Sequence, residues 1–234
     1  MTDRDHPLFQ RLPPGVADLA RRLGARPHGP RSVRLSQTGR MRQSASAAWG
    51  GFTARQSIML EGCAFDWLAR TGPLGAVSVR DALVNGAGLL DVRALGFIRL
   101  ARAEPSAQLT RGELMRYLAE LAWAPDAILR NVGLRWREEG PDRLVVGAGT
   151  GETAAEVTLT LDGEGRIVSA FAPDRGALIN GVTVPTPWRG AFSDYRLHDG
   201  AWLPFSGEVS WERLTGAFIY WQGRIGTWER SHHD

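Results

Sequence analysis

Four carboxylates on predicted strands are the residues best suited to acid–base chemistry: Asp66, Asp81, Asp194 and Glu208. Asp81 follows Val77 and Val79 with a period of two, which predicts that its side chain points to the inner face of a strand. Acid–base catalysis needs such groups held together in a cleft, and sequence spacing alone brings no two of these together. Pairing with an arginine is the commoner role of an inward carboxylate, and Arg80, Arg93 and Arg189 are available.

Other catalytic and metal-binding signatures are missing from the sequence. It contains no GxSxG motif, and the glycine-rich residues 147–151 precede a strand-like pattern, which predicts a hairpin tip and not a phosphate loop. All 28 basic side chains are Arg, so lysine Schiff-base chemistry is excluded. The five His lack metal-ligand spacing, and the single cysteine, Cys63, excludes disulfides within the chain and cysteine zinc sites. We therefore predict no metal site and no cofactor, and assign no catalytic residue.

The aromatic residues are the most informative feature of the sequence. There are nine Trp and three Tyr, and six of the Trp lie at residue 136 or later. Most are expected to pack in a core, but on a curved sheet some of them can line a cavity for an apolar ligand. The predicted liners are Trp123, Trp188, Tyr195, Trp202, Trp211 and Trp221, and Asp81 and Glu208 are candidate polar contacts.

The segment Pro185-Thr186-Pro187-Trp188-Arg189-Gly190 is predicted to be rigid, because two prolines restrict its backbone. It suits the rim of such a site. We expect Arg189 to hold a carboxylate or phosphate head group there, or else to stack on an indole at a structural corner.

The elements that must position these residues are mostly strands. Apolar residues alternate with polar ones in several stretches from Ser32 to about Arg102, and again from Val157 onward. Asn85-Gly86 is a strong hairpin signal. Two helices are predicted, one near 14–23 and one near 110–123, the second with Thr110 and Glu113 as its capping box.

This order predicts an α+β fold that is mostly antiparallel β, namely a curved sheet or half-barrel with one or two helices packed in its concavity. Residues 1–31 are expected to form an N-terminal tail and helix. Residues 32–230 are expected to form a single antiparallel β domain with the inserted helix near 110–123. Composition does not shift along the chain, which favours one domain.

Charge and hydropathy exclude several classes of protein. The formal net charge of +3, with mixed signs, argues against a nucleic-acid partner. No run of about 18 apolar residues is present, so no integral membrane segment is predicted. The polar N-terminus has no apolar signal-peptide core, and we expect a cytoplasmic location.

The C-terminal half carries a family resemblance. The PTPWRG segment at 185–190, Asp194-Tyr195, Gly207-Glu208-Val209, Trp211 and Tyr220-Trp221 resemble a bacterial domain family of unknown function. Asp81, Gly86, Gly88 and the helix residues Leu114 to Trp123 are similar to it too. More remotely, the order of helices and meanders resembles the lipoprotein-carrier fold. That resemblance implies a curved antiparallel sheet that binds acyl chains or lipopeptides.

Three functions follow as hypotheses. The first is binding of an apolar or amphipathic, lipid-like small molecule in a Trp-lined cleft. The second is an enzyme that uses an arginine and one of Asp81, Asp194 or Glu208. The third is an interaction module whose exposed aromatic face meets a protein partner.

Overall fold

The computed structural model describes residues 6–179 and 181–232, and its architecture is one antiparallel sheet curled around helices. The helical segments are α1 (Pro7–Gln10), α2 (Pro14–Leu23), η2 (Pro73–Gly75), α3 (Ala107–Ala119), η3 (Glu120–Trp123), α4 (Pro125–Arg130) and η4 (Gly151–Thr153). Within these described ranges, no helix is long and apolar enough to cross a membrane.

The sheet has 13 strands in the order β6-β5-β4-β3-β2-β1-β13-β12-β11-β10-β9-β8-β7. The strands of the first half are β1 (Ser32–Met41), β2 (Gly50–Met59), β3 (Phe65–Thr71), β4 (Val77–Val84), β5 (Ala87–Ala94) and β6 (Ile98–Arg102). Those of the second half are β7 (Arg135–Glu138), β8 (Arg143–Ala148), β9 (Ala155–Leu161), β10 (Ile167–Ile179), β11 (Val182–His198), β12 (Ala201–Arg213) and β13 (Gly216–Ser231).

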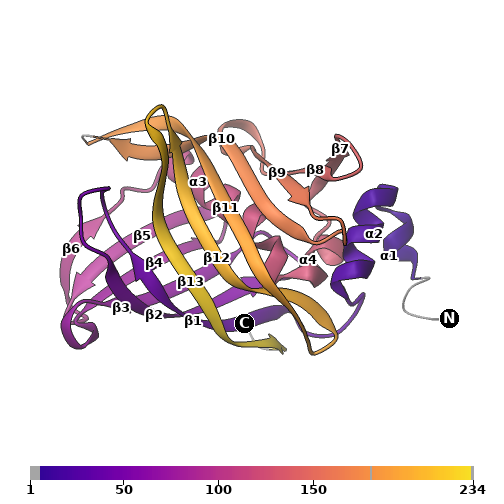
Figure 1. The fold of residues 1–234 in the computed structure, drawn as a ribbon, viewed down its shortest axis with the longest axis horizontal. Coiled ribbons are helices and arrows are strands. Elements are labelled where there is room, and N and C mark those ends of the chain that lie inside the picture. Colours follow the sequence, from indigo (N-terminus) through magenta and orange to yellow (C-terminus); the bar gives the residue numbers. More distant parts are fainter. Residues whose placement is uncertain (1–5, 180, 233–234) are drawn as a thin grey trace.

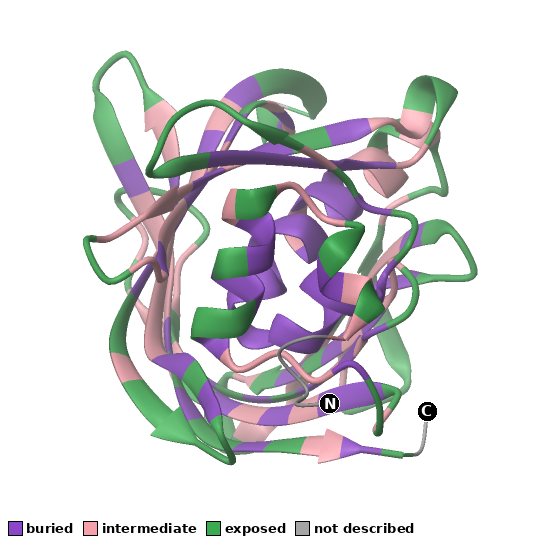
Figure 2. Ribbon diagram, turned by 90° about the vertical axis from the view of Figure 1, so that its right-hand side faces the viewer, coloured by how far each residue is buried: buried purple, intermediate pink, exposed green. Residues whose placement is uncertain are grey.

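Two meanders therefore join along β1 and β13, and the helices α3, η3 and α4 connect β6 to β7. Figure 2 shows helices enclosed by the curled strands, and the α3–η3–α4 segment from Gly112 to Arg130 is buried at every position except Arg116. Tyr117, Leu118 and Leu121 are fully buried there, as the predicted apolar stripe requires. The expected curved sheet with helices in its concavity is confirmed.

The hairpins divide between two rims of the sheet, because successive turns of an antiparallel meander alternate between its edges. The pairing of Met41 with Trp221 places the end of β1 beside the start of β13, which fixes how the two meanders align. We call one edge the first rim; it carries the β1–β2, β3–β4, β5–β6, β8–β9, β10–β11 and β12–β13 connections. The second rim carries the β2–β3, β4–β5, β7–β8, β9–β10 and β11–β12 connections.

Local details both confirm and correct the predictions. The Asn85-Gly86 turn between β4 and β5 is confirmed, with positive φ at both residues. The capping box is wrong, because α3 begins one turn earlier, where the Ser106 hydroxyl accepts from the Leu109 amide. The Thr110 hydroxyl instead accepts from the amide of Gly88 on β5. Residues 7–10 form a short helix that buries Phe9, so part of the expected tail is ordered.

Candidate ligand-binding site

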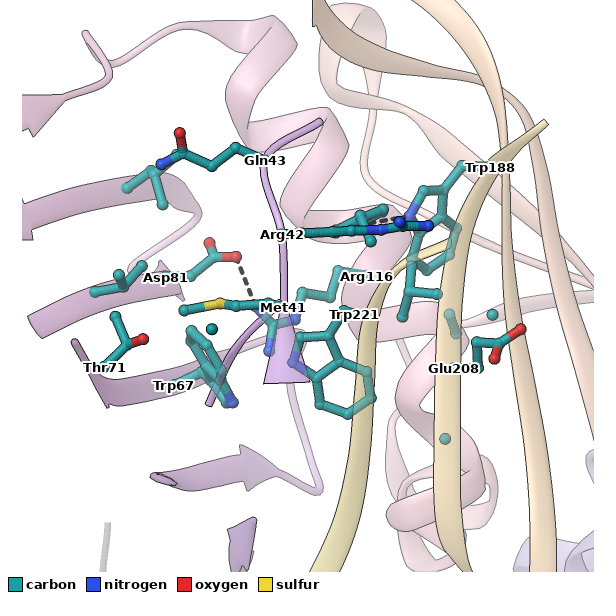
Figure 3. A pocket seen from close by; sticks show the side chains of 18 of the residues that line it. Met41, Arg42, Gln43, Trp67, Thr71, Asp81, Arg116, Trp188, Glu208 and Trp221 are labelled. Carbon is teal, nitrogen blue, oxygen red and sulfur yellow. Dashed lines mark hydrogen bonds and ion pairs between the residues drawn. The ribbon is translucent and has the colours of Figure 1, made fainter. Parts of the chain in front are cut away.

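A cavity of about 590 Å³ lies between α3 and the concave face of the sheet. Its aromatic wall consists of Trp67, Trp123, Trp188, Phe192, Tyr220 and Trp221. Aliphatic side chains from β4 and β5 complete the apolar lining: Val77, Val79, Leu90 and Val92. Figure 3 shows Trp67, Trp188 and Trp221 around this space, with Met41 between Trp67 and Trp221.

Hydrogen bonds fix the orientation of three cavity indoles. Trp67 donates its Nε1–H to Gln37 Oε1 at 2.7 Å, Trp123 donates to the Pro204 carbonyl at 2.8 Å, and Trp188 donates to the Tyr220 hydroxyl at 3.0 Å. Since a buried indole N–H needs a partner, these bonds satisfy the polar edge of each ring. The rings can then offer mainly apolar surface to a ligand.

Backbone shape also makes room for the aromatic wall. Gly207 on β12 lies so close to Trp123 that an added Cβ would be 3.1 Å from its Cζ2 atom. Trp221 lies flat over Gly223 on its own strand, where a Cβ would collide with the indole. Both glycines are needed for close approach of a ring to the backbone.

One side of the cavity is polar and nearly closed to solvent. Arg116 on α3 contacts Asp81 on β4, with Nη1 2.5 Å from Oδ2, and Glu120 on α3, with Nε 2.9 Å from Oε1. Its guanidinium also lies over the rings of Phe65 and Trp67, at 4.7 and 5.1 Å from their centroids. Arg116 therefore joins the sheet, the helix and the aromatic wall.

A second arginine enters the same region from β10. Arg175 lies 4.7 Å over the Trp188 ring and 3.6 Å from Glu113 on α3. We call Asp81, Glu113, Arg116, Glu120 and Arg175 the charged cluster. Gln56 donates to Glu120, which links the charged cluster to β2.

The charged cluster holds three carboxyl groups and two guanidinium groups. Burial raises the pKa of Glu113 well above its ordinary value, and the neighbouring charge of Asp81 raises it further. Asp81 Oδ1 and Glu113 Oε2 are buried and accept no hydrogen bond from any residue that the structure describes. The raised pKa favours the protonated form of Glu113, and this form can donate to Asp81 and leaves two negative and two positive groups in the charged cluster.

Burial opposes the charge on Arg116, but the carboxylates of Glu120, Asp81 and Glu113 outweigh it and raise the pKa of Arg116. Arg116 therefore stays charged throughout the usual pH range.

Replacing Glu113 by Gln is expected to flatten the pH dependence of stability. The pKa of Glu113 is raised in the folded chain, whereas in the unfolded chain it lies near 4.5. Above pH 4.5 the unfolded state therefore binds fewer protons than the folded state. The contribution of Glu113 to the free energy of unfolding then falls as pH rises, until the carboxyl group ionises in the folded chain as well. Urea unfolding from pH 4 to 8 should show that the free energy of unfolding of Glu113→Gln rises relative to that of the wild type as pH increases. A constant difference over that range would contradict the neutral state of Glu113.

The predicted site residues are only partly brought together. Asp81, Trp123, Trp188, Glu208 and Trp221 line the cavity. The Glu208 carboxylate, however, accepts from Gln222 at 2.6 Å and points away from Arg116 and Trp67 (Figure 3). Glu208 therefore lines the cavity, but its carboxylate is held by Gln222 and does not join the charged groups around Arg116.

The remaining four predicted residues lie elsewhere. Arg189 pairs with Glu212 at 3.1 Å and lies over Phe171, so it does not reach the cavity. Tyr195 donates to the Ile167 carbonyl, and Trp202 lines a separate surface hollow beside Arg26. Trp211 is the cross-strand partner of Trp188 and stacks on Tyr220, but it does not line the cavity. Because neighbouring residues of a strand face opposite sides, Arg189 and Trp188 could not both point inward.

Sequence reasoning missed Trp67 and most of the charged cluster. Trp67 had a signal, since it alternates with Phe65 and Ala69 on β3. Glu113, Arg116 and Glu120 recur at helical spacing on α3, which is equally typical of a solvated helix face. Arg175 had no signal, because no local pattern shows that the long strand β10 brings its side chain to α3.

Metal binding finds no support in the described part of the chain, residues 6–179 and 181–232, where no group of three or more His, Cys, Asp and Glu side chains is arranged to hold a metal ion. Cys63 is half-buried, and its thiol accepts from Asn131 at 3.4 Å. Burial raises the pKa of this thiol, which favours a structural role over that of a nucleophile.

Solved structures share this architecture at low sequence identity. A putative outer membrane lipoprotein-sorting protein domain from Vibrio parahaemolyticus has a TM-score of 0.51 and 10% identity, covering 94% of this chain and 92% of its own. A LolA superfamily protein from Nitrosomonas europaea has a TM-score of 0.50 and 9% identity, covering 94% of both chains. A DUF1329 family protein from Desulfovibrio piger has a TM-score of 0.51 and 11% identity, covering 93% of this chain and 92% of its own.

These likenesses define the class of fold, the curved sheet of the lipoprotein carriers. No curated protein matches the chain. The chain belongs to the family of unknown function DUF6544, whose model matches residues 4–223. The predicted membership of an uncharacterised family with a remote carrier-fold resemblance is confirmed.

Proposed function

We propose that this protein binds an apolar or amphipathic small molecule in the cavity between α3 and the sheet. The observation that carries the proposal is a space of about 590 Å³ walled by indole rings and aliphatic side chains. Ligand pockets are commonly of 300–1,000 Å³ and mostly apolar, with a few polar groups that orient the ligand. The carrier fold of the neighbouring structures supports the same class of ligand.

The ligand is expected to be amphipathic because the cavity is two-sided. An alkyl or aromatic portion suits the space between Trp67, Trp188 and Trp221. A polar end suits the part of the charged cluster that lines the cavity beside Trp67, namely Asp81, Arg116 and Glu120. With Glu113 neutral the charged cluster is balanced, so we expect hydrogen bonding to orient the polar end and no strong preference for one sign of charge.

Catalysis by the charged cluster is a second candidate. A carboxylic acid kept neutral beside a carboxylate is a recurring arrangement in acid–base catalysis. The oxygens that would share the proton, Asp81 Oδ1 and Glu113 Oε2, are buried, and Glu113 does not line the cavity. This favours a structural proton in the charged cluster and a binding function for the cavity.

Native mass spectrometry of the purified chain tests the proposal. We expect adducts whose mass corresponds to one small amphipathic molecule per chain, or one-to-one uptake of an added long-chain alcohol. The control is a chain with a narrowed cavity, described in the Discussion. Absence of adducts from both preparations, with no uptake of the alcohol, would overturn the proposed function.

A further inference from the structure

The exposed large apolar side chains gather on the first rim of the sheet. We define the apolar rim as Leu74, Leu95, Phe97, Leu178 and Leu214, which lie in or beside the β3–β4, β5–β6, β10–β11 and β12–β13 connections. Phe97 and Leu178 are each 75% exposed. Adjoining strand ends add more exposed apolar side chains: Ile98, Leu100, Ile179, Val182 and Val184. Figure 1 shows β6 and the end of the β10–β11 hairpin on the same side of the molecule, away from α1 and α2.

The turns of the second rim have the opposite character. Glycine and polar residues predominate in them, as at Asn85-Gly86 and Asp199-Gly200, and the Leu60 side chain of the β2–β3 connection is buried. The exposed apolar side chains nearest to these turns, Val84, Leu197 and Trp202, lie on the strands and not in the turns. Among the hairpin turns, large exposed apolar side chains therefore occur on the first rim; outside the hairpins, Val132 in the α4–β7 loop is also exposed.

Charge is divided between the rims in the same way. The first-rim connections and the two residues on either side of each carry Arg40, Arg42, Arg70, Arg93, Arg99 and Arg213 against Glu152, Glu156 and Glu212. Asp91 offsets part of this charge, since it pairs with both Arg93 and Arg99. The second-rim connections and the two residues on either side of each carry Glu61, Asp66, Glu138, Glu139, Asp142, Asp162, Glu164 and Asp199 against Arg137, Arg143 and Arg166. Part of this charge is offset too, since Arg130 pairs with Glu61 and both Arg26 and Arg230 pair with Asp199. A chain of small net charge thus has a basic, apolar edge and an acidic edge.

The cavity reaches solvent at the basic, apolar edge. The β1–β2 loop of the first rim contributes Arg42, Gln43, Ala47 and Ala48 to its lining, and Gln43 and Ala48 are also exposed on the outer surface. Figure 3 shows Arg42 and Gln43 on the segment that crosses in front of the cavity. The apolar rim therefore surrounds the side from which a ligand enters.

We propose that the apolar rim docks on the surface of a bilayer that contains anionic lipid. The side chains of separate hairpin tips can each enter the boundary between head groups and acyl chains, while the arginines meet lipid phosphates. A protein partner would favour one continuous packed patch, whereas these tips are spaced around an opening. Repulsion of the acidic second rim by the same surface orients the cavity mouth toward lipid.

Sedimentation with vesicles tests this docking. We expect the wild-type chain to sediment with vesicles of phosphatidylcholine and phosphatidylglycerol, less with phosphatidylcholine alone, and less as salt rises. The variant Phe97→Ser/Leu178→Ser/Leu214→Ser should lower partitioning at least about tenfold, because three exposed apolar groups are lost. Leu197→Ser, an exposed apolar side chain near the second rim, is the matched control and should leave partitioning unchanged. These exposed positions tolerate substitution with little effect on folding.

Three results would overturn the docking proposal. The first is that the wild-type chain does not sediment with anionic vesicles at low salt. The second is that the rim variant and Leu197→Ser lose vesicle binding to the same extent. The third is that the wild-type chain is a dimer and the rim variant is a monomer. The last result would show that a second copy covers the rim. Alcohol uptake in vesicle-free solution reports separately on the cavity, so retained uptake without vesicle binding would reject the docking surface alone.

Discussion

Replacing Arg116 by Met is expected to lower the free energy of unfolding by about 3–5 kcal/mol, because it leaves buried carboxylates without their cation. Arg116 is the shared partner of Asp81 and Glu120, and its side chain is only 15% exposed. Met keeps much of the apolar stem but none of the donors. Urea unfolding at pH 7 measures the loss.

Two further variants make that result specific. Arg116→Lys retains the charge but not the planar fork that reaches both carboxylates, so an intermediate loss is expected. Arg80→Met removes an exposed pair with Asp66, and surface pairs contribute about 0–1 kcal/mol. Equal small losses for Arg116→Met and Arg80→Met would contradict the view that the charged cluster holds α3 against β4.

Narrowing the cavity with Val79→Phe/Val92→Phe is expected to weaken ligand binding by about 100-fold, close to twice the 1.4 kcal/mol that corresponds to a tenfold change. Val79 and Val92 are cross-strand partners on β4 and β5 and both line the cavity. The added rings occupy the space that an apolar chain would take. Because the added rings extend into the cavity and not into a packed core, the fold should lose little stability.

Titration of a long-chain alcohol, followed by isothermal calorimetry, measures this change. Ser78→Phe is the matched control, since Ser78 precedes Val79 on β4 and does not line the cavity. We expect it to bind like the wild type. Unchanged affinity in the doubly substituted chain would place the binding site elsewhere.

The overall architecture was predictable because it depends on local patterns. The alternation around Val77, Val79 and Asp81, the Asn85-Gly86 turn and the apolar stripe through Tyr117 and Leu121 each report on their own neighbourhood. Together they limit the chain to a meandering sheet that covers a helix. The start of α3 was predicted one turn late, because Ser106 and Thr110 are both good capping residues and only the tertiary contact of Thr110 with Gly88 separates them.

The site was harder to predict because it joins residues far apart in the chain. The inward direction of Asp81 and its pairing with an arginine were predictable from alternation and composition. The identity of that partner, Arg116, depends on how α3 lies across β4, which no local pattern contains. The strand register likewise decides that Trp188 faces the cavity and Arg189 does not.

Tryptophan fluorescence quenched by a bromine-labelled long-chain alcohol is the most direct test of ligand binding in the cavity. Only some of the nine Trp line it, so we predict saturable but partial quenching. The quenching should be lost in Val79→Phe/Val92→Phe and retained in Ser78→Phe. Quenching that never saturates, or that persists in the narrowed cavity, would contradict a ligand site among these indoles.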